Sequence, residues 1–124
     1  MPTIDDIFSS TGLLAKNING FVPREAQTEM AQAVKEAIDE TGSLVVEAGT
    51  GTGKTFAYLA PALLAEGKAI VSTGTKNLQE QLFHRDLPLV KKALSSRRKT
   101  ALLKGRANYL CLHRLEQHGG NSTL

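Results

Sequence analysis

The chain has 124 residues and a formal net charge of +3, and 41% of its residues are hydrophobic, which suits one compact domain or part of one. Asp5 and Asp6 stand where a signal peptide would be basic, and no stretch approaches the roughly 20 apolar residues of a membrane helix. The single cysteine, Cys111, excludes an internal disulfide framework and favours a reducing, cytoplasmic location.

Charge is uneven along the chain. Residues 1–62 carry four Lys or Arg against eight Asp or Glu, whereas residues 63–124 carry eleven against four. A basic half indicates an anionic partner such as nucleic acid, and a solvated basic face explains it equally well.

The first half of the chain predicts two helices, a strand and a third helix. Residues 3–9 fit a short helix, and apolar residues at helical spacing predict a longer one over residues 24–40. The β-branched, apolar residues 44–46 predict a buried parallel strand. A glycine-rich loop then leads into a helix over residues 54–66, in which Pro61 should introduce a bend.

The second half continues this alternation. Strands are predicted over residues 68–72 and 99–103, separated by a helix over residues 76–85. Asp86, followed by Pro88, suits the cap of a restarted helix. Alternating strands and helices predict an α/β fold with a parallel sheet.

The glycine-rich loop carries the clearest chemical signal. It follows the phosphate-binding pattern G-x-x-x-x-G-K-S/T, with alanine in the first position. Its glycines let successive backbone N–H groups point at phosphate oxygens, and the helix N-terminus adds partial positive charge. We expect Lys54 to reach the β- and γ-phosphates of ATP and Thr55 to hold Mg²⁺, which makes these two the candidate catalytic residues. The loop comprises Ala48, Gly49, Thr50, Gly51, Thr52, Gly53, Lys54 and Thr55.

Three further segments are weaker candidates by themselves. Gln27, near Arg24, offers one donor and one acceptor to an adenine edge, but a helical glutamine is usually just solvated. Polar residues after the second predicted strand suit either contacts to a nucleic-acid backbone or ordinary helix capping. Cys111 alone cannot hold an iron–sulfur cluster, which needs four ligands, and a packing role explains it better.

Together the four segments resemble a known family. FVPREAQ, AGTGTGKT, STGTKNLQEQL and KGRANYLC occur in this order and are similar to motifs of the XPD/DinG-like iron–sulfur superfamily 2 DNA helicases, in particular the bacterial YoaA-type branch. The resemblance implies that Arg24 and Gln27 belong to an adenine-recognising motif and that Cys111 is the first of four cysteines holding a 4Fe–4S cluster. It also implies contacts to the DNA backbone from Thr73, Thr75, Lys76, Asn77 and Gln81.

The resemblance further implies ATP-driven 5′→3′ unwinding of single-stranded or forked DNA in repair or replication, alongside repair or replication proteins. It divides the chain into an N-terminal segment (1–20), the first part of a RecA-like motor domain (21–105) and the start of an iron–sulfur domain (106–124). The acidic box and second motor domain of such enzymes are missing, so we expect an N-terminal fragment with an incomplete sheet. In that sheet residues 44–48 and 68–73 should run parallel without being neighbours.

Two alternatives remain open on the residues alone. One is a different P-loop enzyme, such as a small-molecule kinase. The other is a nucleotide-gated binding module that does not hydrolyse ATP.

Overall fold

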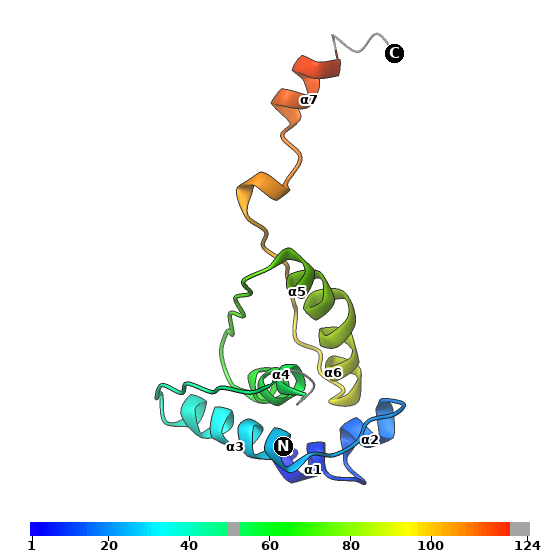
Figure 1. The fold of residues 1–124 in the computed structure, drawn as a ribbon, viewed down its shortest axis with the longest axis vertical. Coiled ribbons are helices and arrows are strands. Elements are labelled where there is room, and N and C mark those ends of the chain that lie inside the picture. The colour runs from blue at the N-terminus through cyan, green and yellow to red at the C-terminus, as the bar shows by residue number, and fades with distance from the viewer. Residues whose placement is uncertain (50–52, 120–124) are drawn as a thin grey trace.

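The computed structural model of the chain describes residues 1–49 and 53–119. Figure 1 shows helices throughout the body of the molecule. In chain order these are α1 (Ile4–Phe8), α2 (Leu13–Asn17), α3 (Glu25–Asp39), α4 (Lys54–Leu64), α5 (Lys76–Gln81), the π-helical turn η1 (Leu82–Asp86), α6 (Leu87–Ala93), the 3₁₀ turn η2 (Arg106–Asn108) and α7 (Leu112–Gly119). Within the described ranges, no helix is both long and apolar enough to span a membrane.

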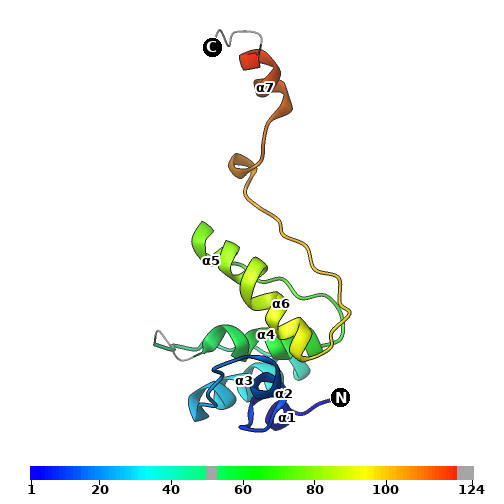
Figure 2. The same ribbon diagram turned by 90° about the vertical axis from the view of Figure 1, so that its right-hand side faces the viewer.

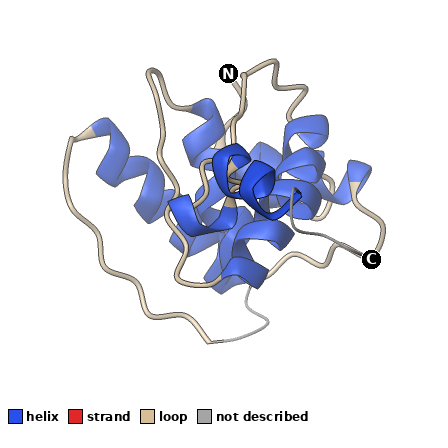
Figure 3. Ribbon diagram, turned by 90° about the horizontal axis from the view of Figure 1, so that it is seen from above, coloured by secondary structure: helices blue, strands red, loops and turns tan. Residues whose placement is uncertain are grey.

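The predicted parallel sheet is wrong. Residues 1–49 and 53–119 contain no strand, and the three predicted strand segments run as loops (Figure 3). Val45, Ile70 and Leu103, one from each segment, are 97%, 96% and 88% exposed. Their β-branched and apolar composition favours extended backbone, but a strand also needs a hydrogen-bonding neighbour about 4.8 Å away. No backbone hydrogen bond joins residues 44–48 to 68–73 among the described residues, so these two segments are not hydrogen-bonded neighbours.

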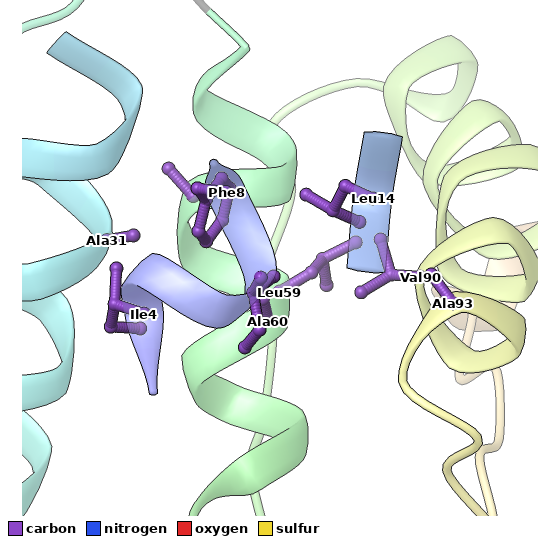
Figure 4. Close-up of a cluster of buried hydrophobic side chains, with 10 residues drawn as sticks. Ile4, Phe8, Leu14, Ala31, Leu59, Ala60, Val90 and Ala93 are labelled. Atoms are coloured by element: carbon purple, nitrogen blue, oxygen red, sulfur yellow. The ribbon is translucent and has the colours of Figure 1, made fainter. Parts of the chain in front are cut away.

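The core lies where five helices meet, namely α1, α2, α3, α4 and α6. Ile4, Ile7 and Phe8 of α1 and Leu14 of α2 pack with apolar side chains of α3, α4 and α6 (Figure 4). Leu14 and Val90 are completely buried and join α2 to α6. The first 20 residues therefore form part of the same hydrophobic core as the phosphate-loop helix.

Helix α1 begins with a reciprocal cap. The hydroxyl of Thr3 accepts from the Asp6 N–H at 3.1 Å, and the Asp6 carboxylate accepts from the Thr3 N–H at 2.8 Å. The bond from the Thr3 backbone, with the hydroxyl second, lowers the pKa of Asp6 from its ordinary value. The predicted short helix over residues 3–9 is confirmed, one residue shorter at each end.

Helices α5 and α6 form one continuous run through η1, so the predicted restart capped by Asp86 is wrong. Asp86 has helical backbone angles and makes no capping hydrogen bond; it is instead only 4% exposed. Pro88 explains the widened turn, because proline cannot donate an N–H and its ring crowds the preceding turn of a regular helix. This turn places Asp86 inside the protein, against α4.

The chain beyond α6 leaves the helical body and ends in α7, well away from it (Figures 1 and 2). Two side chains of α5 contact this segment. Gln79 Nε2 donates to the carbonyl of Leu103 at 3.3 Å, and Glu80 Oε1 lies 3.2 Å from Lys104 Nζ. Residues 105–119 are all exposed.

Candidate nucleotide-binding site

The site is built around the N-terminus of α4. Gly53 precedes this helix with φ 75° and ψ 24°, a left-handed conformation that glycine adopts without strain. Among the described residues, no side chain caps the first turn of α4. The helix therefore presents its N-terminal amides, with their partial positive charge, where an anion can bind. Thr50, Gly51 and Thr52 lie outside the described residues.

Gln27 of α3 contacts this loop directly. Its Nε2 donates to the carbonyl of Gly53 at 3.0 Å, although the two residues are 26 positions apart. Gln27 is 4% exposed, and its Oε1 is buried without a hydrogen-bond partner among the described residues. A buried acceptor left unpaired costs about 1–3 kcal/mol, so a ligand that donates a hydrogen bond to Gln27 Oε1 would be stabilised at this site.

A side chain at position 53 would occupy the same space as Gln27. A Cβ built on Gly53 falls 2.1 Å from Gln27 Nε2 and 2.9 Å from its Cδ. Glycine is thus required here twice, for its backbone conformation and for the close approach of α3.

Lys54 and Thr55 occupy the first turn of α4. Lys54 is exposed, and its Nζ donates to the carbonyl of Ala48 at 3.3 Å, across the loop. An ammonium has three N–H donors, so this contact to a neutral acceptor leaves others that can bind phosphate oxygens. Thr55 is partly exposed. A threonine hydroxyl is an oxygen donor of the kind that Mg²⁺ accepts in company with phosphates.

Tyr58 lies one turn after Thr55 on α4, and Asp86 lies in η1, which packs against α4; sequence reasoning missed both as residues near the site. Burial raises the pKa of the Tyr58 phenol; the side chain of Thr55 one turn earlier lowers this pKa, and the negative charge of Asp86 raises it. Asp86 Oδ1 accepts from Arg85 Nε at 3.1 Å. Two features of the sequence could have indicated these residues: a tyrosine one turn after Thr55 in an apolar stretch of helix, and an acid two residues before a proline.

The remaining residues predicted to contact the nucleotide lie before α3 and on the N-terminal side of the phosphate loop. Arg24 is exposed and precedes α3, where its carbonyl accepts from the N–H groups of Gln27 and Thr28. Ala48 is partly exposed and Gly49 is exposed, both on the N-terminal side of the loop. Gln27, Ala48 and Lys54 are thus linked through the two contacts described above.

The predicted DNA contacts cluster at the start of α5. Thr75 caps this helix, with its hydroxyl accepting from the Leu78 N–H at 3.2 Å, as the capping interpretation required. Lys76 and Asn77 follow in the first turn and are exposed; Gln81 is exposed one turn later, and Thr73 is partly exposed. Exposed donors at a helix N-terminus can contact phosphate.

In the basic half of the chain, some Lys and Arg side chains form hydrogen bonds or ion pairs and others do not. Lys91 Nζ donates to the carbonyl of Arg98, and Arg98 Nη1 donates to the carbonyl of Gly67, at 2.6 and 2.7 Å. Lys104 pairs with Glu80. No side-chain hydrogen bond or ion pair within the described chain engages Lys92, Arg97, Lys99 and Arg106.

Cys111 is a free, exposed thiol directly before α7. Among the described residues, no group of three or more His, Cys, Asp or Glu side chains could hold a metal ion. One thiolate cannot hold a 4Fe–4S cluster, so these residues alone do not fit that group.

A glycine in the left-handed conformation, a Lys-Thr pair at a helix start and a glutamine fixed to the loop define a P-loop nucleotide-binding protein. The family description "DEAD/DEAH box helicase" matches residues 25–118. The chain therefore belongs to the DEAD/DEAH box helicase family, and the resemblance inferred from its four motifs is confirmed.

Curated relatives support the same assignment. The ATP-dependent DNA helicase YoaA of Haemophilus influenzae is 67% identical over 114 residues, 92% of this chain, and YoaA of Escherichia coli is 64% identical over 112 residues, 90% of this chain. The ATP-dependent helicase DinG of Mycobacterium tuberculosis is 49% identical over 104 residues, 77% of this chain. The chain spans only 18% of the two YoaA relatives and 16% of that DinG. No solved structure matches it significantly.

Proposed function

We propose that this chain supplies the ATP-binding loop of an ATP-dependent DNA helicase. The observation that carries the proposal is the contact between Gln27 and Gly53. It brings the predicted adenine-binding residue to the predicted phosphate-binding loop across 26 positions of sequence. Family membership and the names of the similar proteins support helicase activity over a kinase or a binding module without hydrolysis.

ATP binding would involve the phosphate loop at one end of the nucleotide and Gln27 at the other. The loop amides and Lys54 bind the phosphates, and Thr55 holds Mg²⁺, which neutralises phosphate charge. At the other end, the amino group of adenine donates to Gln27 Oε1, which has no partner among the described residues. Because Gln27 Nε2 is already bonded to Gly53, adenine binding and loop position are linked through one side chain.

The proposal extends to DNA and to the iron–sulfur cluster. DNA runs along the start of α5, where Lys76 and Asn77 contact its backbone, and unwinding proceeds 5′→3′ from single-stranded or forked DNA in the cytoplasm. Cys111 contributes one ligand of a 4Fe–4S cluster in the full-length protein, with the other ligands outside this chain. Repair or replication is the context in which such an activity would serve.

Unwinding assays with the full-length protein test the proposal. Duplexes with either a 5′ or a 3′ single-stranded tail should separate only when ATP is hydrolysed, and the 5′-tailed duplex should be preferred. ATP hydrolysis without DNA stimulation would favour another P-loop enzyme, and nucleotide binding without hydrolysis would favour the binding module. Preference for the 3′ tail would refute the polarity.

Base selectivity tests the role of Gln27. Replacing Gln27 by Ala should reduce the ratio of kcat/KM for ATP over GTP by about twofold to tenfold, since a single hydrogen bond to the base contributes about 0.5–1.5 kcal/mol. Lys16→Ala, at an exposed position of α2, is the control and should leave the ratio unchanged. An unchanged ratio in Gln27→Ala would show that Gln27 does not contact adenine.

A further inference from the structure

Residues 103–109 form a short turn, the tyrosine turn, that folds back on itself outside the helical body. Its 3₁₀ helix η2 ends with a hydrogen bond from the Tyr109 N–H to the carbonyl of Arg106 at 3.3 Å. The hydroxyl of Tyr109 then accepts a hydrogen bond from the backbone N–H of Lys104 at 2.7 Å. The phenol ring is therefore held at both its backbone and its hydroxyl end.

Two side chains of α5 hold the tyrosine turn beside that helix. Gln79 Nε2 donates to the carbonyl of Leu103 at 3.3 Å, and Glu80 Oε1 lies 3.2 Å from Lys104 Nζ. Gln79 and Glu80 follow Lys76 by three and four positions, so these three side chains lie on one face of α5. The tyrosine turn is thus attached to the face of α5 that carries a proposed contact to DNA.

The ring of Tyr109 is available to a ligand. Tyr109 is 50% exposed, and it contacts no other aromatic ring within residues 1–49 and 53–119. Residues 104–114 around it include two Arg and one Lys but no Asp or Glu. An exposed aromatic ring among cations is typical of surfaces that bind single-stranded nucleic acid, because the cations attract the backbone and the ring stacks on a base.

We propose that Tyr109 stacks on a base of single-stranded DNA whose backbone lies along the start of α5, and that Gln79 and Glu80 are positioning residues for this ring. Every base has a π face, so the contact is independent of sequence. The bond between the hydroxyl and the Lys104 N–H fixes the ring in advance, which lowers the entropy lost on binding. The inference rests on the proposed function, because it requires DNA at α5.

Fluorescence anisotropy of the full-length protein with labelled single-stranded oligonucleotides, each lacking one base at a different position, tests the inference without ATP. Loss of the base that stacks on Tyr109 should weaken binding to wild type by about fivefold or more. Tyr109→Ala should bind the intact oligonucleotide more weakly by a similar factor, and the missing base should then cause no further loss. Leu110→Ala, which shortens an exposed neighbour that has no ring, is the matched control and should bind as wild type does.

Two further variants separate the ring from its surroundings. Tyr109→Phe keeps the ring and should retain the sensitivity to the missing base. Binding as weak as that of Tyr109→Ala would show that the hydroxyl bond, and not stacking, explains the effect, and would refute the inference. Gln79→Ala removes one attachment without changing charge and should reduce the effect of the missing base; an effect equal to that in wild type would refute the positioning role.

The salt dependence of binding distinguishes failure of this inference from failure of the proposed function. Tyr109→Ala removes no charge and should keep the log–log salt slope of wild type, whereas Lys76→Ala should reduce that slope by about 0.7. If Lys76→Ala reduces the slope while Tyr109→Ala binds every oligonucleotide as wild type does, the inference fails and the proposed DNA contact survives. If neither variant alters binding, both fail.

Discussion

Replacing Gly53 by Ala tests the geometry of the site most sharply. The substitution places a methyl group in a backbone conformation with φ 75° and 2.1 Å from Gln27 Nε2. The left-handed conformation costs a non-glycine residue about 1–2 kcal/mol. Displacing Gln27 adds about 1–3 kcal/mol, because its buried amide loses the bond to the Gly53 carbonyl. We expect a total destabilisation of about 2–5 kcal/mol.

Gly20 provides a matched control for the strain alone. It has φ 77°, and an added Cβ there meets nothing within 4 Å. Gly20→Ala should therefore cost only the conformational part, about 1–2 kcal/mol. Hydrogen exchange of α3 and α4 in the full-length protein measures both variants, since exchange reports the stability of individual segments.

A double-mutant cycle isolates the steric clash between Gln27 and a methyl group added at position 53. Gln27→Ala removes the side chain that the new methyl group would meet, so Gly53→Ala should cost no more in that background than Gly20→Ala does in wild type. Fluorescent ADP binding should show the same dependence on background. An equal cost of Gly53→Ala with and without Gln27 would refute the proposed close approach of α3 to the loop.

Three other predictions concern the wider site. Lys76→Ala should reduce the log–log salt slope of single-stranded DNA binding by about 0.7, whereas Lys16→Ala should not, and equal slopes would mean that Lys76 touches no phosphate. Cys111→Ser should abolish the iron–sulfur absorbance of the full-length protein; unchanged iron content would leave Cys111 outside the cluster. The pKa of Tyr58 is raised in the folded protein, so this group contributes stability that is present below the ordinary tyrosine pKa of about 10 and is lost as pH rises through the pKa of the folded state. The midpoint of unfolding should therefore fall less at alkaline pH in Tyr58→Phe than in wild type. An equal fall in the two proteins would contradict this.

Helices and the phosphate loop could be predicted from sequence because their signals are local. The 3.6-residue spacing of apolar side chains placed α3 within a residue of its observed bounds. The pattern ending in Lys54 and Thr55 placed the start of α4 at the observed residue. The reciprocal cap formed by Thr3 and Asp6 at the start of α1 depends on the same kind of short-range chemistry.

The sheet could not be predicted this way, because strand pairing is not local. Residues around Val45, Ile70 and Leu103 have strand-like composition, yet the described chain gives them no hydrogen-bonding neighbour. Asp86 was misjudged for a related reason: an acid two residues before proline suits a cap, but a π-helical turn places it inside against α4. Both errors concern long-range contacts that short sequence patterns do not specify.

ATP hydrolysis by the full-length protein carrying Lys54→Ala tests the central claim most directly. The rate in the presence of single-stranded DNA should fall by about 10²–10³-fold, because the charge that stabilises the transferring phosphate is removed. Lys16→Ala, which removes an equal charge from α2, should hydrolyse ATP at the wild-type rate. A Lys54→Ala rate near that of wild type would show that this loop does not bind the reacting phosphates.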